Sequence, residues 1–334
     1  MMVDRRNIYI ALLMSLALSS GCYRSESDYS SSSVDVGTSE GTSSFDLGMD
    51  RIESMSLYAQ RPKWMSVSQD VRYKGRMLAS EEDRVRLMFS TLRSAGDDHA
   101  FVVPKDFAKT APASVFDHDD PSFSLLTDGI GILTLPGFGS LKASEINGFE
   151  HQLASQTDKA LTKSTCGLVV DLRRNTGGNM WPMLYGVRPL LGPAPYGYFA
   201  KAHELEPWSA DGGVAGDESA SLAAQYPLDA PVAVLIGPET ASAGEALAVA
   251  FKGRANTMFF GAPTRGLTTA TQRIDVSDSY YIFASVSYLA DSSGTIYRSV
   301  IAPDVRVESV GREDTVVTKA REWLETHCAD AKHR

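Results

Sequence analysis

Apolar and polar residues follow two patterns along the chain, one typical of strands and the other of helices. Short apolar runs predict buried strands at 167–172, 231–237 and 257–261, and further strands are predicted at 129–135, 269–276 and 280–288. Apolar residues three and four positions apart predict helices at 81–94, 144–161, 244–252 and 315–328, and one more from Trp181 onward. The Gly- and Pro-rich stretch 192–226 is predicted to be irregular. Because strands and helices alternate from residue 129, the pattern predicts an α/β fold.

The first 22 residues have the pattern of a secretory signal. Arg5 and Arg6 precede the apolar run 8–18, which is too short to cross a bilayer as a helix. The following Ser-Ser-Gly-Cys is similar to the end of a bacterial lipobox, in which the cysteine is lipidated. We expect an exported protein that a lipid on Cys22 holds on a membrane of the cell envelope, or else a secreted one. A flexible Ser-rich linker is predicted over 23–48.

Composition excludes some partners. The 334 residues include 32 Lys and Arg against 41 Asp and Glu, and there is no basic block, so nucleic acid is not an expected partner. Three cysteines are too few for a disulfide scaffold and lack the C-x-x-C spacing of zinc or redox sites. A disulfide between Cys166 and Cys328 is an option in an oxidising compartment, and the sequence leaves it open.

Two short segments at strand ends have residues that suit acyl chemistry. Gly177 and Gly178 follow the predicted strand 167–172, where their amides suit an oxyanion hole, a phosphate nest or a tight turn. Ser242 stands between the predicted strand 231–237 and helix 244–252. A helix N-terminus stabilises an alkoxide and an oxyanion, so Ser242 is either a nucleophile or a capping serine.

A third segment contains a histidine between acids and a small residue. His99 follows the predicted helix 81–94, and Asp97 and Asp98 precede it directly. Such a histidine is either a general base with an orienting carboxylate nearby or a solvated loop residue. The local sequence alone favours the solvated residue.

Taken in order, four stretches resemble the carboxy-terminal processing (tail-specific) serine peptidases and their relatives, the tricorn core and the interphotoreceptor retinoid-binding protein modules. The stretches are Leu168–Gly178, Val234–Glu245, Gly261–Gly266 and Ile301–Val305. The resemblance covers about residues 64–307. It implies a ClpP/crotonase-like ββα-repeat core over 129–334, the catalytic core, after an N-terminal helical portion over 49–128 that contains His99.

The resemblance is to the tricorn-like subgroup rather than to the processing peptidases. The processing peptidases have a catalytic lysine 25 residues after the serine, where this chain has Leu267. The interval between His99 and Gly129 is also too short for a PDZ domain. The tricorn-like subgroup uses a histidine from an Asp-Gly-His-Thr-like segment, which Asp97–Ala100 resembles, so His99 becomes the expected general base.

One position departs from the subgroup. Its site has a glutamate six residues before the Pro of the Pro-Asp motif, which helps to orient the histidine, and this chain has Tyr297 there. Either Asp98, Asp97 or Tyr297 orients His99 instead, or the site is impaired.

The resemblance implies a serine-type endopeptidase that acts through an acyl-enzyme, with Ser242 as nucleophile and His99 as general base. Its oxyanion hole would consist of the amides of Ala243 and of Gly177 or Gly178. No metal and no cofactor are implied, and the partner is a peptide or protein substrate. The alternative is a non-catalytic peptide- or lipid-binding lipoprotein on the same fold; an acyl-CoA enzyme is disfavoured because acyl-CoA is cytosolic.

Overall fold

The computed structural model describes residues 43–107, 119–140, 142–202, 204–208, 230–308 and 314–332, with side chains up to residue 327. The predicted signal segment and most of the predicted linker lie outside these ranges. The chain forms two compact units. We call residues 43–107 with 269–287 the helical unit and residues 119–268 with 288–332 the sheet unit, and describe each by itself.

The helical unit packs helices against strands that come from two distant parts of the chain. It contains α2 (Ser44–Met55), α3 (Pro62–Met65), α4 (Ser68–Met77), α5 (Glu81–Ala95), β1 (Phe101–Pro104), β9 (Thr269–Asp275) and the first part of β10 (Tyr280–Ala290). β1 pairs antiparallel with β10, with Phe101 opposite Phe283. Met49, Trp64 and Leu92 from the helices and Ile274 and Ile282 from the strands share one buried core.

Both ends of α5 have local causes, and its last turn leads to His99. Ser80 caps the helix by accepting a hydrogen bond from the amide of Asp83, and three acids occupy the first turn. Gly96 ends it in the left-handed conformation at φ 103°. The structure therefore confirms the helix predicted at 81–94.

Helix α2 begins inside the stretch that the sequence analysis assigned to the linker. Ser43 caps the helix, and Phe45 is buried against α4. A Cβ atom at Gly75 would lie 2.0 Å from the Phe45 ring, so the two helices approach closely at this glycine. The linker prediction missed this start because only one apolar residue, Phe45, anchors the first turn.

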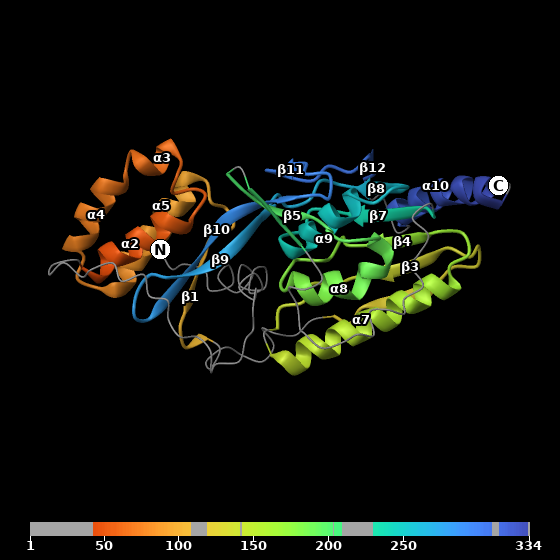
Figure 1. Ribbon diagram of the computed structural model, residues 1–334, viewed down its shortest axis with the longest axis horizontal. Helices are drawn as coiled ribbons and strands as arrows, with labels where there is room; N and C mark the ends of the chain where they lie inside the picture. Colours follow the sequence, from red (N-terminus) through yellow and green to blue (C-terminus); the bar gives the residue numbers. More distant parts are fainter. Residues whose placement is uncertain are drawn as a thin grey trace. The chain divides into compact units, whose positions relative to one another are not determined.

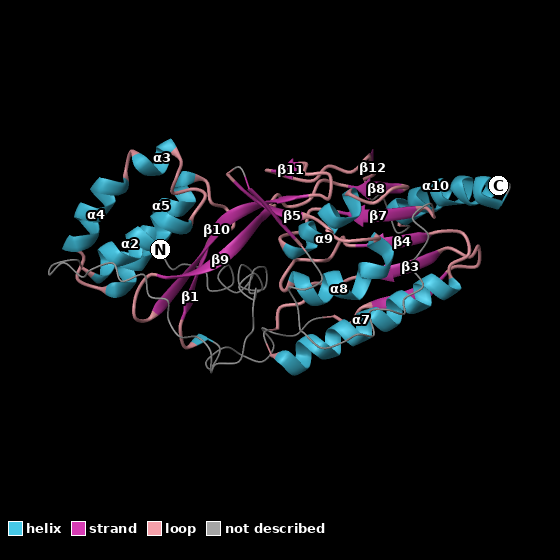
Figure 2. Ribbon diagram, in the orientation of Figure 1, coloured by secondary structure: helices cyan, strands magenta, loops and turns pink. Residues whose placement is uncertain are grey.

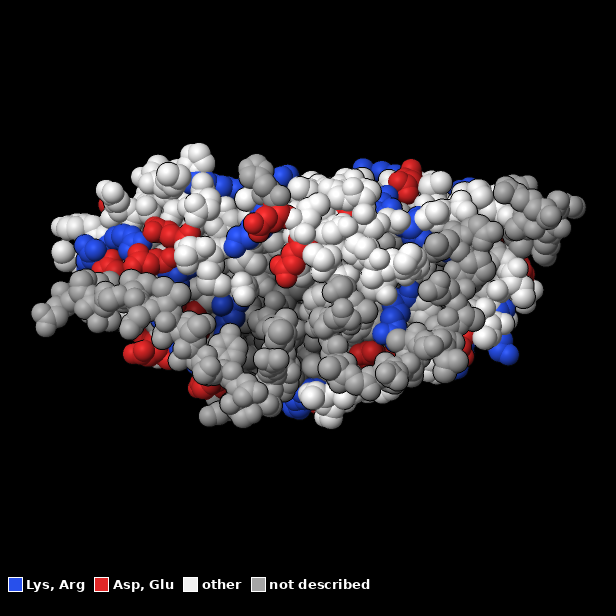
Figure 3. All heavy atoms as spheres, in the orientation of Figure 1, with Lys and Arg blue, Asp and Glu red and all other residues white. Residues whose placement is uncertain are grey.

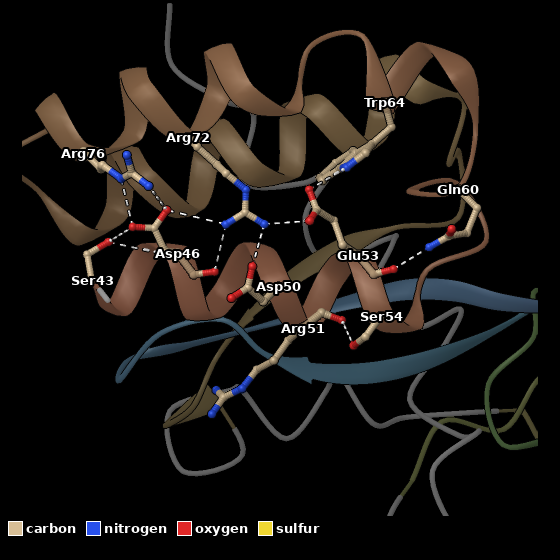
Figure 4. A network of polar contacts seen from close by, with 10 residues as sticks. All are labelled: Ser43, Asp46, Asp50, Arg51, Glu53, Ser54, Gln60, Trp64, Arg72 and Arg76. Carbon is tan, nitrogen blue, oxygen red and sulfur yellow. Dashed lines mark hydrogen bonds and ion pairs between the residues drawn. The ribbon is translucent and has the colours of Figure 1, made fainter. Parts of the chain in front are cut away.

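A network of charged groups joins α2 to α4 (Figure 4). The Arg72 guanidinium donates hydrogen bonds to Asp50 and Glu53, both at 2.6 Å, while Arg76 binds the carboxylate of Asp46. The hydrogen bond from Arg76 lowers the pKa of Asp46 below its usual value, and burial opposes this effect. Figure 3 shows positive and negative side chains interspersed over this part of the surface, which gives neither sign a continuous patch.

The sheet unit has a six-stranded sheet in the order β12-β8-β7-β4-β3-β2. The strands are β2 (Ser122–Leu125), β3 (Gly131–Thr134), β4 (Leu168–Asp171), β7 (Val232–Ile236), β8 (Thr257–Gly261) and β12 (Val305–Arg306). All neighbours are parallel except β2 and β3. This arrangement confirms the predicted α/β fold class.

Helices cover both faces of this sheet (Figures 1 and 2). Val316, Ala320 and Leu324 of α10 (Thr315–Lys332) pack against alternate residues of the buried strands, among them Val169 and Leu235. The connecting helices α7 (Ala143–Lys163), α8 (Met180–Leu191) and α9 (Ala243–Lys252) contact one another and the other face. None of the helices in the described ranges is long and apolar enough to cross a membrane.

A hairpin occupies part of the stretch predicted to be irregular. β5 (Tyr198–Lys201) pairs with β6 (Glu204–Pro207) and with residues 288–290 of β10. Residues 289 and 290 of β10 also pair with β11 (Ile296–Tyr297). Every residue of β6 is exposed, so no alternation of apolar residues marks it. Trp208, which follows it, is fully buried.

The sheet topology brings two loops to the same edge. β4 and β7 are adjacent and parallel, with Asp171 opposite Leu235. The loops that follow them therefore leave the same end of the sheet side by side, which is where ligands bind in open α/β sheets. These are the loops that contain Gly177 and Gly178, and Ser242.

Candidate active site

Ser242 is held in a strained backbone conformation at the start of α9. Its dihedral angles are φ 53° and ψ −117°, a region that residues with a side chain rarely adopt. Such strain persists only where neighbouring contacts fix the turn, and it is concentrated at functional sites. The residue is 3% exposed, between a fully buried strand and a helix that is buried along most of its length.

The carboxylate of Glu245 fixes this turn. It accepts a hydrogen bond from the amide of Ser242 at 2.9 Å, and others from the amides of Gly266 and Leu267, both at 2.8 Å, and from the Thr264 hydroxyl at 2.5 Å. Burial raises the pKa of Glu245 to about 7, against the lowering effect of these four bonds. Glu245 thus has a structural role in the first turn of α9, and it also holds the loop at Leu267.

Asn175 joins the loop that contains Gly177 and Gly178, the glycine loop, to the turn that contains Ser242, the serine turn. Its carbonyl accepts the amide of Ala241 at 3.0 Å, and its side chain donates to the Pro136 carbonyl at 3.1 Å. A Cβ atom at Gly244 would lie 2.4 Å from the Asn175 carbonyl oxygen. Only glycine permits this approach, so the position of the serine turn depends on the glycine loop.

The two glycine amides have different surroundings. The N–H of Gly177 donates to the side-chain oxygen of Asn175 at 3.0 Å. Gly178 forms a parallel bridge with Phe138. In this bridge the amide of Phe138 donates to the carbonyl of Gly177, and the carbonyl of Phe138 accepts from the amide of Asn179. In such a bridge the N–H of the central residue points away from its partner strand. Within the described residues neither Gly178 nor Ala243 has a recorded acceptor for its amide, so the geometry favours Gly178 over Gly177 as a free donor.

His99 lies in the helical unit and is buried, in contrast to the solvated residue that its local sequence favours. Its Nδ1 lies 2.9 Å from the Thr269 hydroxyl, and the side chain is 5% exposed. Burial lowers the pKa of His99 to about 4, so the imidazole is neutral at physiological pH.

The three candidates for orienting His99 have other contacts. Asp97 is fully buried and accepts the backbone amide of His99 at 3.3 Å. Asp98 is exposed and pairs with Arg93 at 3.3 Å. Tyr297 lies in the sheet unit and donates its hydroxyl to Asp291 at 2.9 Å. The imidazole contacts Thr269, which the sequence analysis did not identify because no local pattern marks it.

The structure brings Ser242, Ala243 and the glycine loop together within the sheet unit, whereas His99 belongs to the helical unit. Their pairing stays a prediction. Asp171 and Arg173 form an ion pair at 2.6 Å, and Asp314 extends it at 2.8 Å. Cys166 is disulfide-bonded. Pairing with Cys328 stays an option, as the sequence left it, because the side chain of Cys328 and all of Cys22 lie outside the described residues.

Comparison with known proteins gives relatives over most of the chain. A nisin-resistance protein from Lactococcus lactis subsp. lactis is 24% identical over 286 residues, 84% of this chain and 86% of the relative. A lipoprotein structure from Streptococcus agalactiae matches with a TM-score of 0.71 and 23% identity over 87% of this chain and 99% of that one. A candidate peptidase from Parabacteroides merdae matches with a TM-score of 0.57 and 17% identity, over 85% and 97%.

These structural matches show a shared fold. The model of one peptidase family matches residues 129–307, which is more than half of the chain and includes both the glycine loop and Ser242. The family resemblance inferred from four short stretches is therefore confirmed, and the chain belongs to peptidase family S41.

Proposed function

We propose that the protein is an exported serine endopeptidase in which Ser242 is the nucleophile and His99 the general base. Membership of peptidase family S41 supports a serine peptidase acting on peptides or proteins. The observation that carries the assignment of Ser242 is its conformation, at φ 53° and at the N-terminus of α9. It lies beside the amide of Ala243, which has no acceptor among the residues that the structure describes. A serine that only caps a helix needs no positive φ.

The proposed reaction uses groups of this chain only. Nε2 of His99 removes the proton from the Ser242 hydroxyl as its oxygen attacks a peptide carbonyl. The amides of Ala243 and Gly178 donate to the oxyanion. The C–N bond then breaks as His99 gives the proton to the leaving amine. A water molecule that His99 deprotonates attacks the acyl carbon, and the C–O bond to Ser242 breaks as His99 returns the proton to the Ser242 oxygen.

Digestion of a peptide mixture tests this function. The purified protein and its Ser242→Ala variant are incubated with peptides that include nisin, because one relative is named a nisin-resistance protein. New termini are then identified by mass spectrometry. We expect cleavage by the wild type that the variant loses; equal cleavage by both would refute the role of Ser242.

The relationship to a lipoprotein supports a location in the cell envelope, with Cys22 as the proposed lipid attachment site. The second candidate, a non-catalytic peptide- or lipid-binding lipoprotein, has one observation in its favour. At the position of the subgroup's orienting glutamate, the Tyr297 hydroxyl is committed to Asp291. A folded wild type that binds peptides without cleaving any of them would favour this candidate.

A further inference from the structure

A chain of buried hydroxyl groups links the imidazole of His99 to Asp97. The Thr269 hydroxyl lies 2.9 Å from Nδ1 of His99 and 2.9 Å from the Ser285 hydroxyl, which lies 2.7 Å from Oδ1 of Asp97. Asp97 and Ser285 are fully buried, and Thr269 is 6% exposed. All four residues belong to the helical unit, so this chain is formed within one compact body.

The direction of the hydrogen bonds follows from counting protons. The Asp97 carboxylate accepts the amide and the hydroxyl of Ser285, at 2.9 and 2.7 Å. Each hydroxyl has one proton to donate. Because Ser285 gives its proton to Asp97, Thr269 must donate to Ser285. The Thr269 oxygen then accepts from His99, so Nδ1 carries the imidazole proton and Nε2 is unprotonated.

We propose that Thr269 and Ser285 are positioning residues that transmit the charge of Asp97 to His99 and fix the tautomer with its basic nitrogen at Nε2. This inference rests on the proposed function, because only a general base needs that nitrogen unprotonated. The hydroxyl groups replace a direct carboxylate contact with the imidazole. Asp97 acts on the imidazole of His99 through the hydroxyl groups of Ser285 and Thr269. It also accepts a hydrogen bond from the backbone amide of His99.

The same geometry makes Asp97→Asn an informative change. Oδ2 of Asp97 accepts the Ser285 amide at 2.9 Å, whereas Oδ1 accepts the His99 amide at 3.3 Å as well as the Ser285 hydroxyl. Because the Ser285 amide makes the shorter bond, the side-chain oxygen of the asparagine faces it and the NH2 group faces the Ser285 hydroxyl. That hydroxyl then accepts instead of donating, and each following bond reverses. Nδ1 of His99 becomes an acceptor, and the proton moves to Nε2, where it blocks the base.

The experiment measures the His99 tautomer by ¹⁵N NMR of the full protein, alongside the rate at which a fluorophosphonate modifies Ser242. In the wild type we expect a protonated Nδ1 and an unprotonated Nε2. Asp97→Asn should exchange the two signals and slow modification by about 10⁴-fold, the scale of a wrong tautomer in a catalytic triad. Thr269→Val should slow it about 10- to 100-fold.

The strand supplies matched controls. Thr269→Ser keeps the hydroxyl and should restore most of the rate that Thr269→Val loses. Thr271, two residues along β9, is equally buried, and its hydroxyl has no hydrogen-bond partner in the described part of the chain. Thr271→Val should therefore leave both the rate and the tautomer unchanged. These controls separate the hydrogen-bond relay, which runs from Asp97 through Ser285 and Thr269 to His99, from a general effect on the fold.

Two results would overturn the relay: a protonated Nε2 in the wild type, or Thr269→Val modified as fast as Thr271→Val while His99→Ala loses modification. The second result would leave the proposed function intact. Conversely, the expected tautomer together with an unreactive Ser242 would refute the proposed function and leave the relay standing.

Discussion

Burial changes the acid–base behaviour of His99. Burial lowers its pKa to about 4, so protonation, which would remove the base, occurs only in acid. We predict that Ser242 modification by a fluorophosphonate keeps a constant rate from about pH 8 to 6 and is half-maximal near pH 4. A midpoint near 6.5, the value of an exposed histidine, would contradict this environment.

Gly244 is the residue on which the fit between the two site loops depends. Its Cβ atom would lie 2.4 Å from the Asn175 carbonyl oxygen and 2.8 Å from the side-chain oxygen, so Gly244→Ala must push the serine turn away from the glycine loop. Displacements of this size cost about 100-fold in rate, which we expect for Ser242 modification. Gly148→Ala in α7 is the control, because nothing lies within 4 Å of its Cβ position. Equal rates in the two variants would refute the role of this contact.

At the scale of elements, the pairing of α2 with α4 depends on Arg72. Its side chain is 19% exposed and pairs with three carboxylates, so Arg72→Met leaves Asp50 and Glu53 without this cation and Asp46 with Arg76. We expect a loss of about 2 kcal/mol in the free energy of unfolding, measured in urea. Lys74→Met, which removes an exposed pair on the same helix, should cost less than about 0.5 kcal/mol. Similar losses would show that the network contributes no more than a surface pair.

The elements that could be predicted are those with a strong apolar pattern. β4 and β7 are buried on both faces, so each appears in the sequence as a short apolar run. α5 has a capping serine and a terminal glycine, which mark its two ends in the sequence. The hairpin of β5 and β6 was missed because β6 is exposed throughout and derives its order from pairing. Local sequence holds no signal for such a strand.

At the scale of the whole molecule, the candidate site residues divide between two units. Ser242 and the candidate amides of Ala243 and the glycine loop could be picked out from the sequence, because each lies in a short motif that follows a buried strand. Thr269 and Ser285 were not, because 16 residues separate them and only the register of β9 and β10 brings their hydroxyl groups together. Likewise, β9 and residues 280–287 belong to the helical unit although they are distant from its helices in the sequence, and only tertiary contacts bring them together.

Export is a property of the whole chain and has its own test. We predict that Cys22→Ala abolishes incorporation of an alkyne-labelled fatty acid and moves the protein from the membrane fraction to the soluble one, in a bacterial host that processes lipoproteins. The adjacent Ser20→Ala variant should keep both the label and the location. Unchanged labelling of Cys22→Ala would exclude this residue as the lipid attachment site.

The central claim, that Ser242 is a nucleophile activated by His99, is tested most directly by fluorophosphonate modification with the labelled residue mapped by mass spectrometry. This measurement needs no knowledge of the substrate. We predict modification at Ser242 that is absent from Ser242→Ala and strongly reduced in His99→Ala. A folded wild type with no more modification than Ser242→Ala would contradict the account.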